Sequence, residues 1–384
     1  MEFSFTEEQQ MIRDTAESFL QDVSTSEAIR KAMATEDGYD PGLWQQICAD
    51  LYFQAITIPE EFGGMGLGFV ELVAVFEQMG RFLLCAPYFS TVGLAANALL
   101  VAANAEQQAE YFPRILEGKT ASLAYTGTSG KWDAATVDAV YKKEGDSYVL
   151  NGEYRYVIDG HTADFLIVAA RQEGTLGEEG LGLFIMPANS VGVERNWLPT
   201  MDQTRKQASV VLKNVSLSAS ALMSENAWPQ LQKIIQLAQI CLAAEQAGGT
   251  QQILDMTVEY TKERVQFNRP IASFQAIKHK AADMMLKAEV AKSAIYYAAC
   301  VAQEAVFNGD EVIASELPEA SAMAKAHCSD SYFFNAGNAI QMFGGVGFTW
   351  EYDVHLYFKR AKSSELLFGN GAWHREQIAQ ILLG

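Results

Sequence analysis

The middle of the chain contains a segment of strand-forming residues, Ser147-Tyr148-Val149-Leu150-Asn151-Gly152-Glu153-Tyr154-Arg155-Tyr156-Val157-Ile158-Asp159-Gly160. The β-forming residues on both sides of Asn151-Gly152 predict a β-hairpin, because Asn-Gly favours the tight turn between two antiparallel strands. Further apolar runs of strand length follow at 165–170, 183–186 and 208–212. Strands at this spacing predict a small β-barrel or sandwich between about residues 121 and 215.

Helical periodicity flanks this β region on both sides. Thr6 followed by Glu7 and Glu8 predicts a helix start, since acidic residues favour the positive end of the helix dipole. Apolar residues recur at helical spacing over 234–264, 274–307 and 318–341, which predicts long helices packed as a bundle. The sequence therefore predicts a mainly α-helical protein with a central β domain, in three consecutive domains: N-terminal helical at 1–118, middle β at 119–227 and C-terminal helical bundle at 228–384.

The chain is strongly acidic, with a formal net charge of -19 over 384 residues. Such a field repels phosphate, which argues against a nucleic-acid or anionic-membrane partner but leaves room for a small anion held by a local basic group. The sequence has no apolar run long enough to span a bilayer and no signal-peptide pattern, so we expect a cytoplasmic protein. The five cysteines are scattered, without a CxxC or a Cys–His spacing, and we expect buried thiols and no metal site.

Four motifs follow one another along the chain. They are the Gly/Pro-rich loop at 58–66, the segment 147–160, Arg264-Val265-Gln266-Phe267 with Pro270, Phe274 and Gln275 after it, and Gln341-Met342-Phe343-Gly344-Gly345-Val346-Gly347-Phe348. In this order they resemble the acyl-CoA dehydrogenase superfamily, over essentially the full chain. The resemblance implies an N-terminal helical domain, a middle β-barrel and a C-terminal four-helix bundle, with FAD as cofactor.

The resemblance also implies which residues bind FAD. Arg264 and Phe267 would lie at a helix end that reaches the FAD of a neighbouring subunit, where a planar, permanently charged guanidinium suits a pyrophosphate. From the residues alone, the same pair equally fits a surface arginine followed by a core phenylalanine. Glycines 344 and 345 let backbone N–H groups approach phosphates closely, because no Cβ intervenes. The predicted FAD-binding set is Tyr125, Thr126, Tyr156, Ile158, Arg264, Phe267, Phe274, Gln275, Gln341, Gly344, Gly345 and Asn370.

The part of this set expected around the flavin ring departs from the family pattern. Ile158 stands where a hydroxyl residue near the reactive flavin nitrogen is usual, so a hydrogen bond to the reduced flavin is lost. Tyr156 stands where the family has an aromatic residue on the flavin, although a tyrosine in a strand is more commonly an ordinary sheet residue. Segment 126–133 also differs from the glycine-rich acidic loop of the family.

The catalytic base of the family is missing from its usual places. The reaction removes the proton α to the thioester, which requires a carboxylate in an apolar pocket. Phe368 occupies the usual position of that glutamate, and Ala238 occupies the alternative one. Glu245 lies seven residues after Ala238, hence on nearly the same helix face. We therefore predict Glu245 as the catalytic candidate, against the alternative that it pairs with a basic residue in a structural role.

The C-terminal residues 358–375 resemble a divergent bacterial branch, which includes the smaller subunits of pimeloyl-type dehydrogenases and subunits of steroid side-chain acyl-CoA dehydrogenases. The resemblance implies an acyl-CoA substrate in lipid or steroid catabolism, an electron-transfer flavoprotein-like acceptor, and a homo- or heterotetramer (α2β2). Three functions remain open. The chain is an FAD-dependent acyl-CoA dehydrogenase, a non-catalytic partner subunit that completes a neighbour's FAD site, or a family member with altered chemistry such as a desulfinase or flavin monooxygenase.

Overall fold

Contacts within the chain divide it into two units in the computed structural model, which describes residues 6–384. One unit comprises Met1–Lys31, Phe69–Leu84 and Gln239–Gly384, and the other comprises Ala32–Gly68 and Cys85–Ala238. The expected fold class, mainly α-helical with a central β domain, is confirmed.

The first unit is helical. Its elements include α1 (Glu7–Val23), α2 (Ser26–Met33), α4 (Phe69–Arg81), α7 (Trp228–Glu263), α8 (Gln275–Gln303), α9 (Glu311–Ala314), α10 (Leu317–Phe343), α11 (Val354–Leu366) and α12 (Gly371–Leu383), of which α2 ends and α7 begins in the other unit. Thr6 caps α1 through a reciprocal pair of hydrogen bonds with Gln9, which confirms the expected helix start. The three long helices expected from periodicity correspond to α7, α8 and α10.

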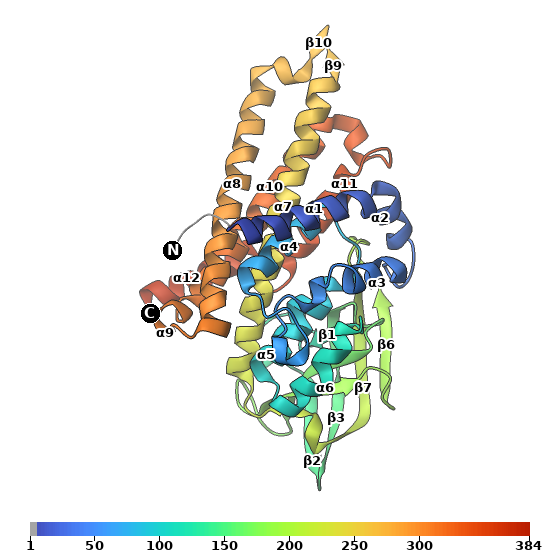
Figure 1. The fold of residues 1–384 in the computed structure, drawn as a ribbon, viewed down its shortest axis with the longest axis vertical. Coiled ribbons are helices and arrows are strands. Elements are labelled where there is room, and N and C mark those ends of the chain that lie inside the picture. Colours follow the sequence, from blue (N-terminus) through green and yellow to red (C-terminus); the bar gives the residue numbers. More distant parts are fainter. Residues whose placement is uncertain (1–5) are drawn as a thin grey trace. The chain divides into compact units, whose positions relative to one another are not determined.

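Glycines allow α4 and α7 to pack at close range. A Cβ at Gly80 would lie 2.0 Å from the carbonyl oxygen of Glu245, and a Cβ at Gly248 would lie 1.8 Å from that of Glu77. Beyond this crossing, α7 extends beside α8 (Figure 1). The two helices end in a small hairpin of β9 (Val265–Gln266) and β10 (Arg269–Pro270), and they form an arm that displays this hairpin.

The second unit contains one sheet. Its strands are β1 (Ala121–Ala124), β2 (Val140–Glu144), β3 (Ser147–Ile158), β4 (Phe165–Gln172), β5 (Leu181–Pro187), β6 (Val193–Leu198), β7 (Gln207–Ser218) and β8 (Leu222–Ser224). They follow the order β6-β7-β3-β2-β4-β5-β8, and β1 pairs with β4. The apolar core of the sheet includes Tyr148, Tyr154 and Phe184. The same unit holds α3 (Pro41–Ala49), α5 (Asn97–Ala102), α6 (Ala105–Leu116) and a buried π-helix (Phe89–Ala96).

The hairpin turn expected at Asn151-Gly152 is wrong. These residues lie inside the single strand β3, and the tight turn is at Gly145, between β2 and β3. Gly152 instead marks a register shift against β7, and a Cβ there would lie 2.4 Å from the Cα of Ala139. The glycine therefore serves a bulge and a close backbone approach, which produce the same sequence signal as a turn.

Within residues 6–384, none of the helices has the length and apolar character needed to cross a bilayer. The five cysteines are free thiols, and four of them, Cys48, Cys85, Cys241 and Cys328, are buried as expected.

Candidate functional site

The hairpin at the end of the α7–α8 arm displays an aromatic side chain. Phe267 and Asn268 form its turn, both in the left-handed region with φ of 52° and 62°. This conformation is unfavourable for an aromatic residue. The Phe267 ring is nevertheless 87% exposed, so Phe267 is not a core residue. Strain at an exposed apolar ring indicates a position built for contact with a group outside this chain.

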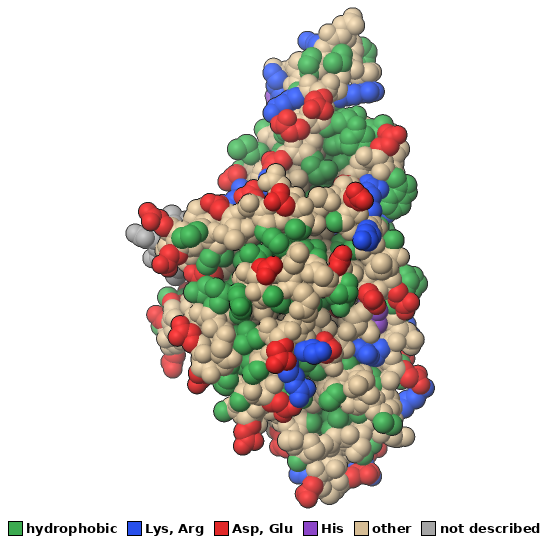
Figure 2. Space-filling model, turned by 45° about the vertical axis from the view of Figure 1, so that its right-hand side comes forward, with side chains coloured by type: hydrophobic (Ala, Val, Ile, Leu, Met, Phe, Trp, Pro, Cys, Tyr) green, Lys and Arg blue, Asp and Glu red, His purple; other side chains and the backbone are tan. Residues whose placement is uncertain are grey.

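Other predicted residues surround this turn. The Phe274 ring lies 6.1 Å from the Phe267 ring. The Arg269 guanidinium stacks over the Phe274 ring at 4.0 Å. Gln275 follows directly as the first residue of α8, and Arg264 is exposed at the base of the hairpin. Residues 262–292 contain seven Lys or Arg and three Asp or Glu, in a chain that is acidic overall. Figure 2 shows basic side chains gathered towards the end of the arm, where they favour an anionic ligand.

The predicted glycine loop lies beside the same helix. Gln341 is exposed in the last turn of α10, and exposed Gly344 and Gly345 begin the short 3-10 helix Gly344–Phe348. A Cβ on either glycine would meet nothing within 4 Å, so packing inside the chain does not require glycine there. Phe343 stacks on Tyr260 at 4.0 Å, one helical turn before Arg264. The structure therefore brings the arginine motif and the glycine loop together at the end of α7.

In the β unit, Tyr156 is aimed outward by a bulge. Its φ is 60°, the register with β7 shifts between Tyr154 and Val157, and its ring is 44% exposed. The ring lies over Gly130, where a Cβ would come within 2.9 Å of it. The Arg155 N–H donates to the Thr126 oxygen at 3.0 Å, which places the predicted Tyr125–Thr126 segment beside this bulge. In contrast to the Tyr156 ring, the side chain of Ile158 is buried, with only 3% of it exposed.

The Tyr125 hydroxyl is buried near the Thr126 side chain and makes no well-formed hydrogen bond within residues 6–384. Burial raises the pKa of Tyr125 well above its ordinary value, so the hydroxyl stays a donor. A buried donor without a well-formed hydrogen bond suits a polar ligand atom. In the β unit, the Tyr125 hydroxyl therefore suits a polar atom of a flavin nucleotide. In the helical unit, the open space over Gly344 and Gly345 suits its phosphates.

The residues considered for the position of the catalytic base, Phe368, Ala238 and Glu245, are buried. Phe368 is 3% exposed, with φ of 57°, and Asn370 accepts a hydrogen bond from the Trp373 N–H as the N-cap of α12. Glu245 is 7% exposed, and its backbone lies where α7 crosses α4. Ala238 is fully buried on the same helix. A carboxyl group therefore lies inside the helical unit, on α7, and not on the Phe368 segment.

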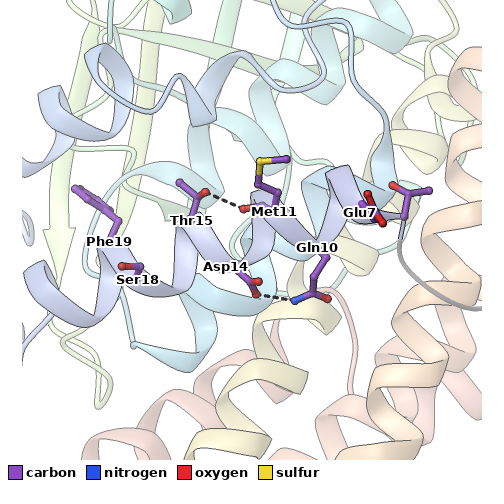
Figure 3. Close-up of a pocket in the computed structure, with 8 residues that line it drawn as sticks. Glu7, Gln10, Met11, Asp14, Thr15, Ser18 and Phe19 are labelled. Carbon is purple, nitrogen blue, oxygen red and sulfur yellow. Dashed lines mark hydrogen bonds between the residues drawn. The ribbon is translucent and has the colours of Figure 1, made fainter.

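Two surface hollows occur in the helical unit. One runs along α1 (Figure 3) and contains no predicted site residue. Its lining is Thr6, Glu7, Gln10, Met11, Asp14, Thr15, Ser18 and Phe19. The second lies on α8, α10 and α11 and includes Gln341. Its lining is Lys280, Asp330, Phe333, Phe334, Gly337, Asn338, Gln341 and Glu365.

Two residues that none of the sequence motifs marks, Arg269 and Trp132, lie beside the predicted ones. Arg269 stacks on Phe274, and Trp132 packs 5.9 Å from Tyr125. The available signals were a second arginine within five residues of Arg264 and a tryptophan inside a polar loop.

Two family models match the chain. The acyl-CoA dehydrogenase N-terminal domain matches residues 6–119, and the acyl-CoA dehydrogenase C-terminal domain matches residues 227–383. Acyl-CoA dehydrogenase IpdE2 of Mycolicibacterium smegmatis is 32% identical over 98% of each chain.

Solved structures agree with this similarity. Butyryl-CoA dehydrogenase from Megasphaera elsdenii superposes with a TM-score of 0.90 at 26% identity, covering 100% of both chains. The ChsE4–ChsE5 complex from Mycobacterium tuberculosis gives a TM-score of 0.88 at 26% identity, covering 100% of this chain and 99% of that chain.

Proposed function

Because the chain belongs to the acyl-CoA dehydrogenase family, we propose that it takes part in FAD-dependent α,β-dehydrogenation of an acyl-CoA thioester, as one subunit of an α2β2 enzyme. The observation that carries this proposal is a contrast within the chain. Arg264, Phe267 and Gln341, which suit FAD, are presented at the surface, while the usual position of the base holds the buried ring of Phe368. A chain of this kind suits an enzyme completed by a second chain. The relative solved as a ChsE4–ChsE5 complex supports the heteromeric part.

The described residues suggest how FAD would be held. Arg264 would pair with the pyrophosphate, helped by backbone N–H groups at Gly344 and Gly345. The exposed Phe267 ring would pack on the adenosine part, and Gln275 and Gln341 would supply hydrogen bonds, with Phe274 supporting the turn from within the chain. In the β unit, Tyr156 would pack on the flavin, with Tyr125 and Thr126 beside it. Bound FAD would accept the hydride from the β carbon of the substrate.

Proton removal from the α carbon requires a carboxylate, and we propose Glu245 for this role in the chain. Glu245 is 7% exposed and lies on an otherwise small and apolar face of α7, which is the setting that a catalytic carboxylate of this kind occupies. Glu245→Gln is therefore expected to lower turnover by about 10²–10⁴-fold, the usual contribution of a general base. The matched control is Glu365→Gln, because Glu365 pairs with Lys362 at 2.8 Å and should be replaceable with little loss. A decrease below about tenfold in Glu245→Gln excludes Glu245 as the base.

The function itself is tested by expressing the chain alone and together with a second family chain from the same source. Bound flavin is read from its absorption, and turnover from reduction of an artificial electron acceptor with a series of acyl-CoA thioesters, including steroid side-chain thioesters. Bound flavin and enoyl-CoA formation when both chains are present, but not with this chain alone, support the proposal. Absence of flavin under both conditions, even with added FAD, contradicts it. The physiological acceptor we propose is an electron-transfer flavoprotein-like protein.

A second function is favoured by Phe368 and Ile158 together. Neither side chain can exchange a proton or donate a hydrogen bond, so the chain would complete the FAD site of a neighbour and perform no chemistry itself. Turnover by the chain alone would contradict this alternative. Turnover that requires the partner but is insensitive to Glu245→Gln would support it.

A further inference from the structure

A lysine is fully buried beneath the segment that carries Phe368. Lys325 lies in α10 and is 0% exposed. Its Nζ donates to Ser329 Oγ at 2.8 Å, to the carbonyl oxygen of Glu365 at 3.2 Å and to that of Gly369 at 3.1 Å. An ammonium group has three N–H donors, so these contacts satisfy it completely.

The two carbonyl groups mark the two sides of a strained turn. Glu365 lies in the last turn of α11, and Gly369 precedes α12, with Phe368 between them. Phe368 and Gly369 are both left-handed, with φ of 57° and 97°. Such a conformation at an aromatic residue persists only where its surroundings hold it. Lys325 therefore holds both ends of the turn through hydrogen bonds to backbone carbonyl groups.

The same lysine connects this turn to α7. Ser329, which accepts from Lys325, is hydrogen-bonded to the side-chain amide of Gln246 at 3.1 Å. A second amide, that of Gln239, donates to the Phe368 oxygen at 3.3 Å. Gln246 is the residue after Glu245, so the turn and the proposed base are attached to the same helix.

The contacts of Lys325 argue against a role in stability alone. All three acceptors are neutral oxygens, and burial lowers the pKa of Lys325 to about 7, so the ammonium form is costly here compared with an apolar side chain of similar volume. A lysine that only filled space would be replaceable by methionine at little or no cost. The benefit of the ammonium group is directional, since it fixes two particular carbonyl oxygens.

We propose that Lys325 is a positioning residue that holds the Phe368–Gly369 turn in one backbone geometry and fixes it relative to α7. This inference rests on the proposed function, because the turn corresponds to the segment that carries the base in the family. In the assembled enzyme, the turn would then form a rigid wall of the thioester site although it carries no acid. Lys325 itself touches neither substrate nor cofactor.

The test compares backbone hydrogen exchange in the full chain with Lys325→Met, and with Lys278→Met as the exposed control. We expect the amides of residues 366–370 to exchange at least about tenfold faster in Lys325→Met, because local opening sets the exchange rate. Exchange in the cores of α7 and α10, the flavin content and the melting temperature should stay near wild type. Unchanged exchange at 366–370, or equal acceleration throughout the helical unit, would overturn the proposal.

Lys325→Gln provides a graded second variant, since it keeps two N–H donors without the charge, and it replaces Lys325→Met if the latter does not fold. An acceleration between wild type and Lys325→Met is expected. In the assembled enzyme, Lys325→Met should lower kcat by about 10- to 100-fold with little change in KM, as small misplacements of a reacting site do.

Exchange does not depend on turnover, so the two claims can fail separately. A loosened turn in a protein that stays inactive even with its partner chain supports the role of Lys325 and contradicts the proposed function. An active enzyme in which Lys325→Met leaves exchange in the turn unchanged supports the proposed function and contradicts the role of Lys325.

Discussion

Two turns of the helical unit place a phenylalanine in the left-handed backbone region, and they differ in what covers the ring. Phe267, with φ of 52°, is 87% exposed at the end of the α7–α8 arm. Phe368, with φ of 57°, is 3% exposed, and its turn is held by Lys325 and Gln239. The chain covers the second strained ring itself and leaves the first for another group. The same local geometry thus serves binding in one place and rigidity in the other.

The largest difference is expected when each ring is removed. Phe368→Ala should lower the free energy of unfolding by about 3–5 kcal/mol, because deletion of a buried aromatic ring leaves a cavity. Phe267→Ala should change it by less than about 0.5 kcal/mol, as is usual for exposed positions. Denaturant unfolding without added FAD measures the free energy of unfolding of both variants. Equal losses would show that the two turns do not differ in this way.

A second difference concerns the cofactor. Arg264→Met should weaken FAD binding by about 10- to 100-fold, since hydrogen bonds to a charged group contribute about 1.5–3 kcal/mol. The control is Lys262→Met, which removes a nearby exposed cation that pairs with Glu259 at 2.6 Å. Flavin fluorescence titration measures both variants in the assembled protein. An equal effect of the two substitutions would mean that the arm attracts FAD only by its overall charge.

The covered turn should also be sensitive to acid. Burial first, and then the charge of Lys325, lowers the pKa of His374 in α12 to about 3. Below about pH 6.5 the unfolded chain takes up a proton that the folded chain resists, so stability falls by about 1.4 kcal/mol per pH unit as the pH decreases. From pH 7 to pH 5, the wild type should therefore lose about 2 kcal/mol more stability than His374→Asn. Equal losses of stability in wild type and His374→Asn would contradict the low pKa of His374.

Much of the fold could be predicted because its signals are local. The three long helices follow from apolar spacing over 234–264, 274–307 and 318–341, and Thr6 follows from capping chemistry. The hairpin was misplaced because Asn151-Gly152 forms a bulge inside β3, where Gly152 is needed for the approach of Ala139. That requirement depends on a neighbouring segment, which the local pattern does not contain.

The site was less predictable, for the same reason. Left-handed backbone is unfavourable for phenylalanine, so nothing in the identity of Phe267 or Phe368 indicates their turns, although Gly369 is a partial signal. Lys325 belongs to none of the sequence motifs. The sequence Ala324-Lys325-Ala326 places a charged residue between small residues in a long helix, a pattern that indicates a buried cation once the helix is known to lie in a bundle.

The central claim is that the chain carries the FAD-binding half of a dehydrogenase and is completed by a second chain. Native mass spectrometry of the protein, expressed with and without its candidate partner, tests this most directly. We expect an α2β2 assembly with bound FAD when both chains are present, and no active flavoprotein from this chain alone. A flavin-loaded homotetramer that dehydrogenates acyl-CoA without a partner would contradict the account.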